Sequence, residues 1–180
     1  MIKKDTNYKT QISLAGEFAV LSQLALHGKD ANMTLGNTKG VDILVSDPVT
    51  GKMMKLEVKT NYNSNAKIVS SKLFGNILNT WILGVKNEEY DEKKDANLFY
   101  CFVNINKTTN NFKFYIVHSK TVANYLKSEN RFWHQEKKNE NKKVVHTDMR
   151  QFRLGFENEK YKIPTPIGEY YENNWNFEIK

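Results

Sequence analysis

The sequence predicts a folded domain of the α/β class, and three observations lead to that class. Apolar residues recur at helical spacing over residues 10–27, and two runs with strand character, 41–45 and 53–60, flank a turn. A second pair of strand-like runs, 98–105 and 112–117, precedes another helical pattern. The 180 residues show no internal repeat and no linker-like segment, so we expect a single domain over residues 1–180.

The first expected helix runs from about Thr10 to His27. Gly28 supplies its stop, because glycine readily adopts the left-handed conformation that often follows a helix. Glu17 is the only acidic residue of this helix and stands among apolar neighbours. The apolar stripe is broad enough to be largely covered by the rest of the fold, and it consists of Ile12, Ala15, Phe18, Ala19, Leu21, Leu24, Ala25 and Leu26.

Two strands and a tight connection should form a β-hairpin after this helix. The strands are Val41–Val45 and Met53–Thr60, and both are rich in β-branched and apolar residues. The segment between them reads Ser-Asp-Pro-Val-Thr-Gly and is dense in turn-forming residues. We therefore expect antiparallel pairing between the strands.

The middle of the chain is less regular. Residues 61–86 begin polar and become apolar, which predicts either one helix or a helix followed by a strand. Leu98–Ile105 is aromatic and β-branched without clean alternation, as expected of a strand buried on both faces. Phe112–Val117 should pair with it. Cys101, inside this run, is expected to be a buried thiol rather than a nucleophile.

The last third predicts a short helix and a return to the sheet. Ser119 is a suitable cap for a helix that ends near Lys127. The polar, basic residues 129–143 give no clear signal, and 144–156 are expected to rejoin the sheet. The tail after Pro164 is rich in aromatic residues, which we expect to pack across the body of the protein.

The composition favours a polyanionic partner. The net charge is +7 and the pI is near 9.3, and lysine contacts to phosphate gain free energy by counterion release. Nearly all basic residues are lysines and asparagine is frequent, a bias that genome composition explains equally well. The polar N-terminus resembles no signal peptide and no segment reaches transmembrane length, so we expect a cytoplasmic protein without membrane contact.

The expected hairpin carries residues suited to phosphodiester hydrolysis. Such hydrolysis uses a divalent cation, and hard cations such as Mg²⁺ prefer carboxylate oxygens. Glu57 and Lys59 are two residues apart on one strand, so their side chains share a face. With the turn near residues 48–50, antiparallel pairing brings Asp42 within about two positions of Glu57. Asp42 also lies in an apolar run, where its charge requires a partner.

These residues, in this order, resemble the core of the PD-(D/E)XK nuclease superfamily, which includes many type II restriction endonucleases. The matching motifs are Gly-Glu-Phe around Glu17, Gly-Val-Asp at Asp42 and Glu-Val-Lys-Thr from Glu57. The resemblance covers about residues 12 to 60, and it departs from the family at Val41, where many members have proline.

The resemblance implies a restriction-endonuclease-like core with a mixed central β-sheet flanked by helices. It implies that Asp42, Glu57 and the Val58 carbonyl bind Mg²⁺, for which Mn²⁺ can substitute. Lys59 would be the catalytic lysine, and Glu17 an accessory acid that adds a metal ligand or holds Lys59; the alternative for Glu17 is a helix carboxylate facing solvent. DNA would be the substrate.

Two further segments are candidates for DNA contact, although each is equally well explained as a solvated loop. The first follows the hairpin and is acid-free over residues 60–87. The second is the basic stretch 137–153. The histidines match neither a zinc site nor a known nuclease motif. The candidate contacts are Asn63, Asn65, Lys67, Lys72, Lys142, Lys143 and Arg150.

The leading hypothesis is therefore a magnesium-dependent DNA endonuclease, most simply a small restriction-type enzyme that acts as a homodimer, since so short a chain leaves little room for a separate recognition domain. A structure-specific or repair nuclease of the same fold is the second hypothesis. A nucleic-acid-binding module that keeps the fold without catalysis is the third. An unrelated interaction protein would show no salt-sensitive affinity for DNA.

Overall fold

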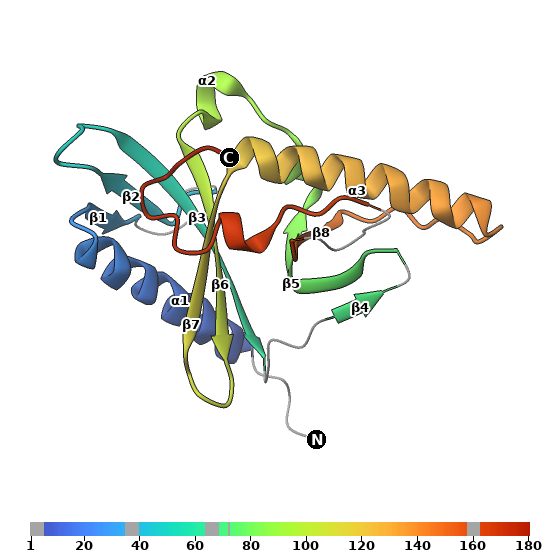
Figure 1. Cartoon of the computed structure of the whole chain (residues 1–180), viewed down its shortest axis with the longest axis horizontal. Helices are drawn as coiled ribbons and strands as arrows, with labels where there is room; N and C mark the ends of the chain where they lie inside the picture. Colours follow the sequence, from blue (N-terminus) through green and yellow to red (C-terminus); the bar gives the residue numbers. More distant parts are fainter. Residues whose placement is uncertain (1–5, 35–39, 64–68, 72, 158–162) are drawn as a thin grey trace. The chain divides into compact units, whose positions relative to one another are not determined.

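The computed structural model describes residues 6–34, 40–63, 69–71, 73–157 and 163–180 (Figure 1). The chain forms two compact units, each with its own β-sheet. Unit 1 comprises Met1–Asn65, Asn97–His118 and Tyr171–Lys180, and unit 2 comprises Ala66–Ala96 and Ser119–Tyr170. The expectation of a single domain over the whole chain stays a prediction.

Unit 1 combines one long helix with a five-stranded sheet. The helix α1 spans Thr6–Leu26, and the sheet has the strand order β1-β2-β3-β6-β7 (Figure 1). Neighbouring strands are antiparallel except for β3 and β6, which are parallel, so the sheet is mixed. The predicted α/β class and mixed sheet are confirmed. The strands are β1 Asp30–Met33, β2 Ile43–Ser46, β3 Met53–Asn63, β6 Leu98–Asn106 and β7 Phe112–His118.

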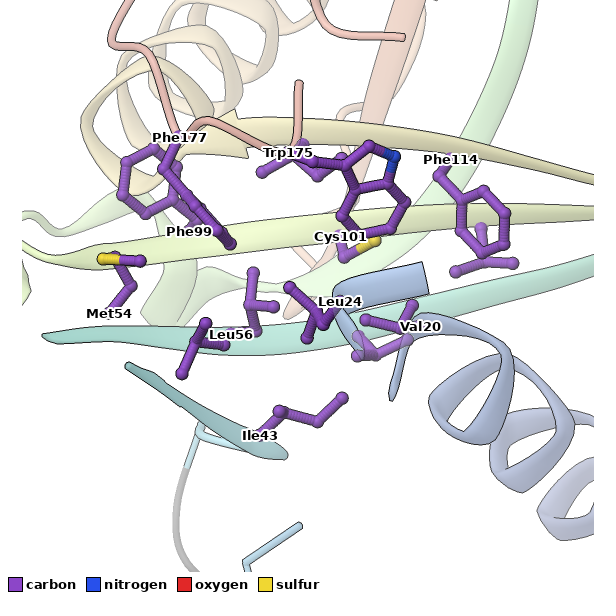
Figure 2. Close-up of a cluster of buried hydrophobic side chains, with 14 of the residues drawn as sticks. Val20, Leu24, Ile43, Met54, Leu56, Phe99, Cys101, Phe114, Trp175 and Phe177 are labelled. Carbon is purple, nitrogen blue, oxygen red and sulfur yellow. The ribbon is translucent and has the colours of Figure 1, made fainter. Parts of the chain in front are cut away.

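The core of unit 1 gathers around one face of this sheet. Val20 and Leu24 of α1 are fully buried, in the same cluster as Ile43 of β2 and Leu56 of β3. Figure 2 shows these side chains together with Trp175 of the C-terminal tail. Burial of this many apolar side chains is the main source of stability for such a unit. The tail aromatics pack on the body as predicted.

The thiol of Cys101 lies in this cluster and is fully buried. Burial raises its pKa, because the charged thiolate is poorly solvated there. The prediction of a buried thiol is confirmed.

A buried aspartate fixes the turn between β2 and β3. One Asp47 carboxylate oxygen accepts hydrogen bonds from the backbone N–H groups of Val49 (2.9 Å) and Thr50 (3.3 Å). The other carboxylate oxygen lies 2.7 Å from Lys29 Nζ, and this ion pair holds the pKa of Asp47 well below its usual range. Gly51 closes the turn with a φ of 69°, a conformation that favours glycine. The turn therefore sets the register of the hairpin.

Unit 2 contains a second, antiparallel sheet that the sequence did not predict. Its strand order is β4-β5-β8, with β4 Val69–Ser71, β5 Gly75–Gly84 and β8 Met149–Gly155. The helix α3 runs from Ser119 to Asn139. The short elements of this unit are η1 Val85–Glu88, α2 Glu92–Asp95 and η2 Gly168–Tyr170.

Three sequence predictions are corrected by the structure. Residues 61–86 were expected to contain a helix, yet their described part is extended in β3, β4 and β5 before η1. In β5 the buried Trp81 and Leu83 alternate with Ile82, which is 65% exposed, so apolar residues on both faces conceal the period of two. The helix from Ser119 also continues well beyond Lys127, and β8 joins the second sheet rather than the first.

No helix in the described part of the chain is both long enough and apolar enough to cross a membrane.

Candidate active site

The hairpin register places Asp42 beside Glu57. Ile43 of β2 pairs with Leu56 of β3, and the Asp42 N–H donates a 2.7 Å hydrogen bond to the Leu56 carbonyl. Ile43 and Leu56 both point into the core of unit 1. Because side chains alternate along a strand, the next residues outward, Asp42 and Glu57, point to the opposite face together.

Glu57 and Lys59 form an ion pair on that face. The Lys59 Nζ lies 2.7 Å from Glu57 Oε1. The Glu57 side chain is 6% exposed and that of Lys59 is 31% exposed, so the ammonium group compensates a nearly buried carboxylate while reaching solvent itself. The two side chains emerge next to each other, as their spacing predicted.

The Asp42 carboxylate is held by the backbone of the neighbouring strand. Its Oδ2 accepts a 2.6 Å hydrogen bond from the Val58 N–H. Its Oδ1 accepts no hydrogen bond from the part of the chain that the structure describes. One oxygen is therefore fixed and the other is available to a ligand. The Val58 side chain is itself buried in the core, which keeps this stretch of β3 in place.

Gly40 gives the chain the shape it needs next to the carboxylates. Its φ is 73°, and a Cβ at this position would lie 3.5 Å from Glu57 Oε2. Thr34 holds the two residues that follow Gly40. Its Oγ1 donates to the Val41 carbonyl at 2.7 Å, and its N–H donates to the Asp42 carbonyl at 2.9 Å. A glycine at this position therefore permits the backbone to turn while approaching Glu57 closely.

A second glycine brings α1 against β3. Gly16 is buried, and a Cβ built there would lie 2.0 Å from the Thr60 Oγ1 and 3.0 Å from the Thr60 Cβ. Only a residue without a side chain permits this approach of helix to strand. The next residue in the helix is Glu17, and the next toward the N-terminus in the strand is Lys59. The glycine contact therefore fixes the distance of Glu17 from the hairpin carboxylates.

Glu17 interacts electrostatically with the hairpin residues. Burial raises the pKa of the Glu17 carboxyl, the negative charge of Asp42 raises it further, and Lys59 lowers it in part. The side chain is half-buried. The two sequence hypotheses for Glu17, a site residue or a helix carboxylate facing solvent, both stay predictions. Three acids and one lysine thus share one region of unit 1.

The raised pKa of Glu17 predicts a pH-dependent cost to stability. The folded chain holds the Glu17 proton to a higher pH than the unfolded chain does. Protonated Glu17 therefore contributes to the free energy of unfolding below its ordinary pKa of 4.5, and this contribution is lost as the pH rises through the folded-state pKa. We expect the Glu17→Gln variant to lose less stability than wild type between pH 4.5 and neutrality. Urea denaturation in EDTA measures this difference. A variant that follows the wild-type pH dependence would contradict it, and Glu178→Gln, an exposed acid of unit 1, is the matched control.

The Asp42 and Glu57 carboxylates are the oxygen donors that this region offers to a divalent cation. Among the described residues, no three His, Cys, Asp or Glu side chains converge as a metal-binding cluster. Mg²⁺ is commonly held by only one or two carboxylates, with water and substrate phosphate completing its shell. Asp42 Oδ1, which has no hydrogen-bond partner among the described residues, lies on the same face as the Glu57 carboxylate, and this pair fits that mode of binding.

The residues expected to contact DNA are placed as follows. Asn63 is exposed at the end of β3, and Asn65, Lys67 and Lys72 lie outside the described residues.

Lys142 and Lys143 are exposed in unit 2, and Lys142 Nζ lies 2.8 Å from Glu140 Oε2. Arg150 is 9% exposed; its Nε donates to Glu88 Oε1, and its Nη1 donates to the Thr147 and Met149 carbonyls. This guanidinium is therefore bonded inside unit 2, whereas both lysines are exposed at its surface, Lys142 in an ion pair with Glu140.

The sequence motifs contain Gly16, Gly40 and Thr60, but sequence reasoning gave none of the three a role in the site. Each glycine stands one or two residues before a proposed catalytic acid, and that adjacency was the available signal. Its meaning depends on contacts between residues far apart in the sequence, which spacing alone does not reveal.

Comparisons with known proteins find a likeness to solved structures. No protein-family model and no curated protein matches the chain. Among solved structures, the bacterial homing endonuclease I-Ssp6803I is similar, with a TM-score of 0.50 and 12% sequence identity. The likeness covers 93% of this chain and 90% of that one. At this identity it shows the fold alone: the chain has the fold of a known nuclease over nearly its whole length.

Proposed function

We propose that this chain is a metal-dependent endonuclease that hydrolyses DNA phosphodiester bonds. The observation that carries the proposal is the convergence of Asp42, Glu57 and Lys59 on one face of the hairpin, with one carboxylate oxygen of Asp42 unbonded in the described structure. The shared fold with a homing endonuclease supports the same conclusion. The net charge of +7 suits a polyanionic substrate.

Asp42 and Glu57 would hold the cation, with the Val58 carbonyl as a further oxygen ligand in the manner of PD-(D/E)XK nucleases. Mg²⁺, or Mn²⁺ in its place, would supply charge neutralisation at the phosphate and a more acidic water. The hydrogen bond from the Val58 N–H fixes the orientation of Asp42 before any ligand arrives. This preorganisation reduces the rearrangement needed on binding.

Lys59 is the group placed to act on the nucleophile and the phosphate. Its ammonium lies 2.7 Å from Glu57 Oε1 and reaches solvent, so it can orient a water and stabilise negative charge on the phosphate oxygens. Glu17 has a raised pKa and stands near Asp42 and Lys59. It would accept or hold a proton beside the site, or keep Lys59 in position.

The finer assignment is a small restriction-type enzyme that acts as a homodimer. Two copies of one site would allow both strands of a duplex to be cut, one by each copy. A DNA methyltransferase encoded beside this gene would favour restriction, because a sequence-specific cutter requires its host sites to be protected.

The proposal is tested by incubating supercoiled plasmid with the protein and Mg²⁺, Mn²⁺ or Ca²⁺, or with EDTA. We expect nicking or linearisation with Mg²⁺ and Mn²⁺ and none with EDTA. The Lys59→Met variant should cut about 10²- to 10³-fold more slowly, the cost typical of losing one preorganised charge-stabilising group. The Lys52→Met variant removes an exposed lysine of the same hairpin and should cut normally.

Binding is measured separately by gel shift in Ca²⁺, so that loss of affinity is distinguished from loss of chemistry. Lys59→Met should retain most of its affinity, since one lysine among many contributes little to polyanion binding. Cleavage by Lys59→Met at the wild-type rate would contradict the role given to this residue. Binding by wild type without cleavage under any metal would favour the non-catalytic module.

A further inference from the structure

Unit 2 contains a cavity of about 260 Å³ that the proposed cleavage site does not use. One wall comes from α3 and another from β8, with the segment that joins them completing the lining. Its size suits one small ring system, because pockets for drug-sized ligands usually start at about 300 Å³. The lining residues that matter are Asn130, Trp133, Val145, Met149 and Gln151.

The apolar residues that line the cavity are at least partly exposed. Trp133 is half-buried, and the centroids of the Trp133 and His134 rings are 5.3 Å apart. Val145 and Met149 are 58% and 50% exposed, although both are large apolar residues in a basic part of the chain. An indole beside two exposed apolar side chains provides the kind of surface on which an aromatic ring stacks.

Neutral amides supply the polar edge of the cavity. The Asn130 side chain has no hydrogen-bond partner among the described residues, so its donor and acceptor are both available. The Gln151 Oε1 accepts from Arg153 Nη2, which leaves the amide NH₂ of Gln151 as a donor. Adjacent donors and acceptors of this kind match the hydrogen-bonding edges of nucleobases.

The charged groups around the cavity are arranged for a nucleotide rather than for a charged ring. Two charged residues of the lining are neutralised by ion pairs, Glu129 with Arg153 at 3.0 Å and Arg150 with Glu88. Outside, the rim is basic: Lys137 Nζ lies 5.5 Å from the Trp133 ring centroid, and the lysine-rich segment 137–143 leads to Val145. An uncharged ring carried on a phosphate satisfies both features.

We propose that this cavity binds a single nucleobase, stacked on Trp133 and hydrogen-bonded at its edge by Asn130 and Gln151. The base would come either from a nucleotide extruded from DNA or from a free nucleotide, which share the same chemistry. The proposal goes beyond the nuclease function and does not depend on it, because binding in this cavity requires neither a metal nor cleavage.

The first experiment uses the intrinsic tryptophan fluorescence of the full chain in EDTA. Trp81 and Trp175 are 1% and 2% exposed, so quenching on titration with the four deoxynucleoside monophosphates reports on Trp133. We expect saturable quenching, weakened about fivefold or more in Asn130→Ala by the loss of hydrogen bonds. Asn124→Ala, an exposed asparagine on the same helix, is the matched control and should bind as wild type does. Gln151→Ala provides a second pocket variant.

The second experiment distinguishes the source of the base. A duplex that contains 2-aminopurine fluoresces more strongly when that base is unstacked. We expect the 2-aminopurine fluorescence to rise when wild type or Asn124→Ala binds the duplex, and to rise less with Asn130→Ala. This result assigns the cavity to a base extruded from DNA. If mononucleotides bind but the fluorescence of the duplex does not change, base binding in the cavity is supported and the cavity is assigned to free nucleotides. The proposal is overturned if neither probe responds, or if Asn130→Ala and Asn124→Ala behave alike.

Discussion

Replacement of Glu57 by glutamine is expected to reduce Mg²⁺-dependent DNA cleavage by at least about 10³-fold. Glutamine has nearly the same shape, so the change removes a charged oxygen ligand without leaving a hole in a nearly buried position. It also removes the 2.7 Å ion pair that holds Lys59 in place. Initial rates of plasmid cleavage, with circular dichroism to confirm folding, measure the effect.

The same assay provides the controls for this prediction. Asp42→Asn should act in the same direction, and the double variant should be scarcely worse than either single variant, because groups that act as a unit are not additive. Asp30→Asn changes an exposed acid on β1 of the same sheet and should leave the rate unchanged. Cleavage by Glu57→Gln within a few-fold of wild type would remove this residue from the site.

The second large effect is expected from Gly16→Ala. Alanine is the better helix former by about 1 kcal/mol, which alone would stabilise α1. Its Cβ would lie 2.0 Å from the Thr60 Oγ1 and 3.0 Å from two carbons of that stiff, β-branched side chain. Overpacking typically costs about 1–3 kcal/mol, so the variant should be less stable by up to about 2 kcal/mol. The displacement of α1 should also slow cleavage, because Glu17 moves with the helix.

Chemical denaturation and cleavage rates test this effect together. Thr60→Ala in the Gly16→Ala background should restore part of the stability, because it removes two of the three crowding atoms. Gly84→Ala is the matched control, since a Cβ there meets no heavy atom closer than 3.8 Å. A Gly16→Ala variant as stable and as active as wild type would show that the close approach of α1 to β3 is unnecessary.

The hairpin was predictable from the sequence because local rules determine it. Alternation places Glu57 and Lys59 on one face, and the turn residues around Asp47 set the register that brings Asp42 alongside. The end of the first helix was equally clear, since it ends where the sequence places Gly28, whose φ is 69°. The helix begins at Thr6 rather than near Thr10, and Phe18 and Leu26, expected on a largely covered stripe, are 59% and 76% exposed. Periodicity and turn chemistry act over a few residues, which a single sequence displays.

The second sheet was not predictable in the same way. Ile82 is apolar and 65% exposed, so the alternation of β5 resembles a continuous apolar run. The end of α3 was not predictable because the segment after Lys127 is polar and shows no apolar helical pattern. Glu129 in this segment is nevertheless buried, where it pairs with Arg153. Long-range pairing, rather than local propensity, decides both segments.

The finer details of the site also depend on contacts across the sequence. Nothing near Asp42 in the chain indicates that its carboxylate bonds to the Val58 N–H, 16 residues away. The parallel pairing of β3 with β6 likewise joins Glu57 to Tyr100. The candidate site residues could therefore be proposed from the sequence, whereas the contacts of Gly16 and Gly40 required coordinates.

Anomalous X-ray diffraction from crystals soaked in Mn²⁺ tests most directly whether the hairpin carboxylates bind a cation. We expect a peak contacted by both Asp42 and Glu57 in the wild type, and no such peak in the Glu57→Gln variant. A wild-type structure with Mn²⁺ bound elsewhere and none at these two carboxylates would contradict it.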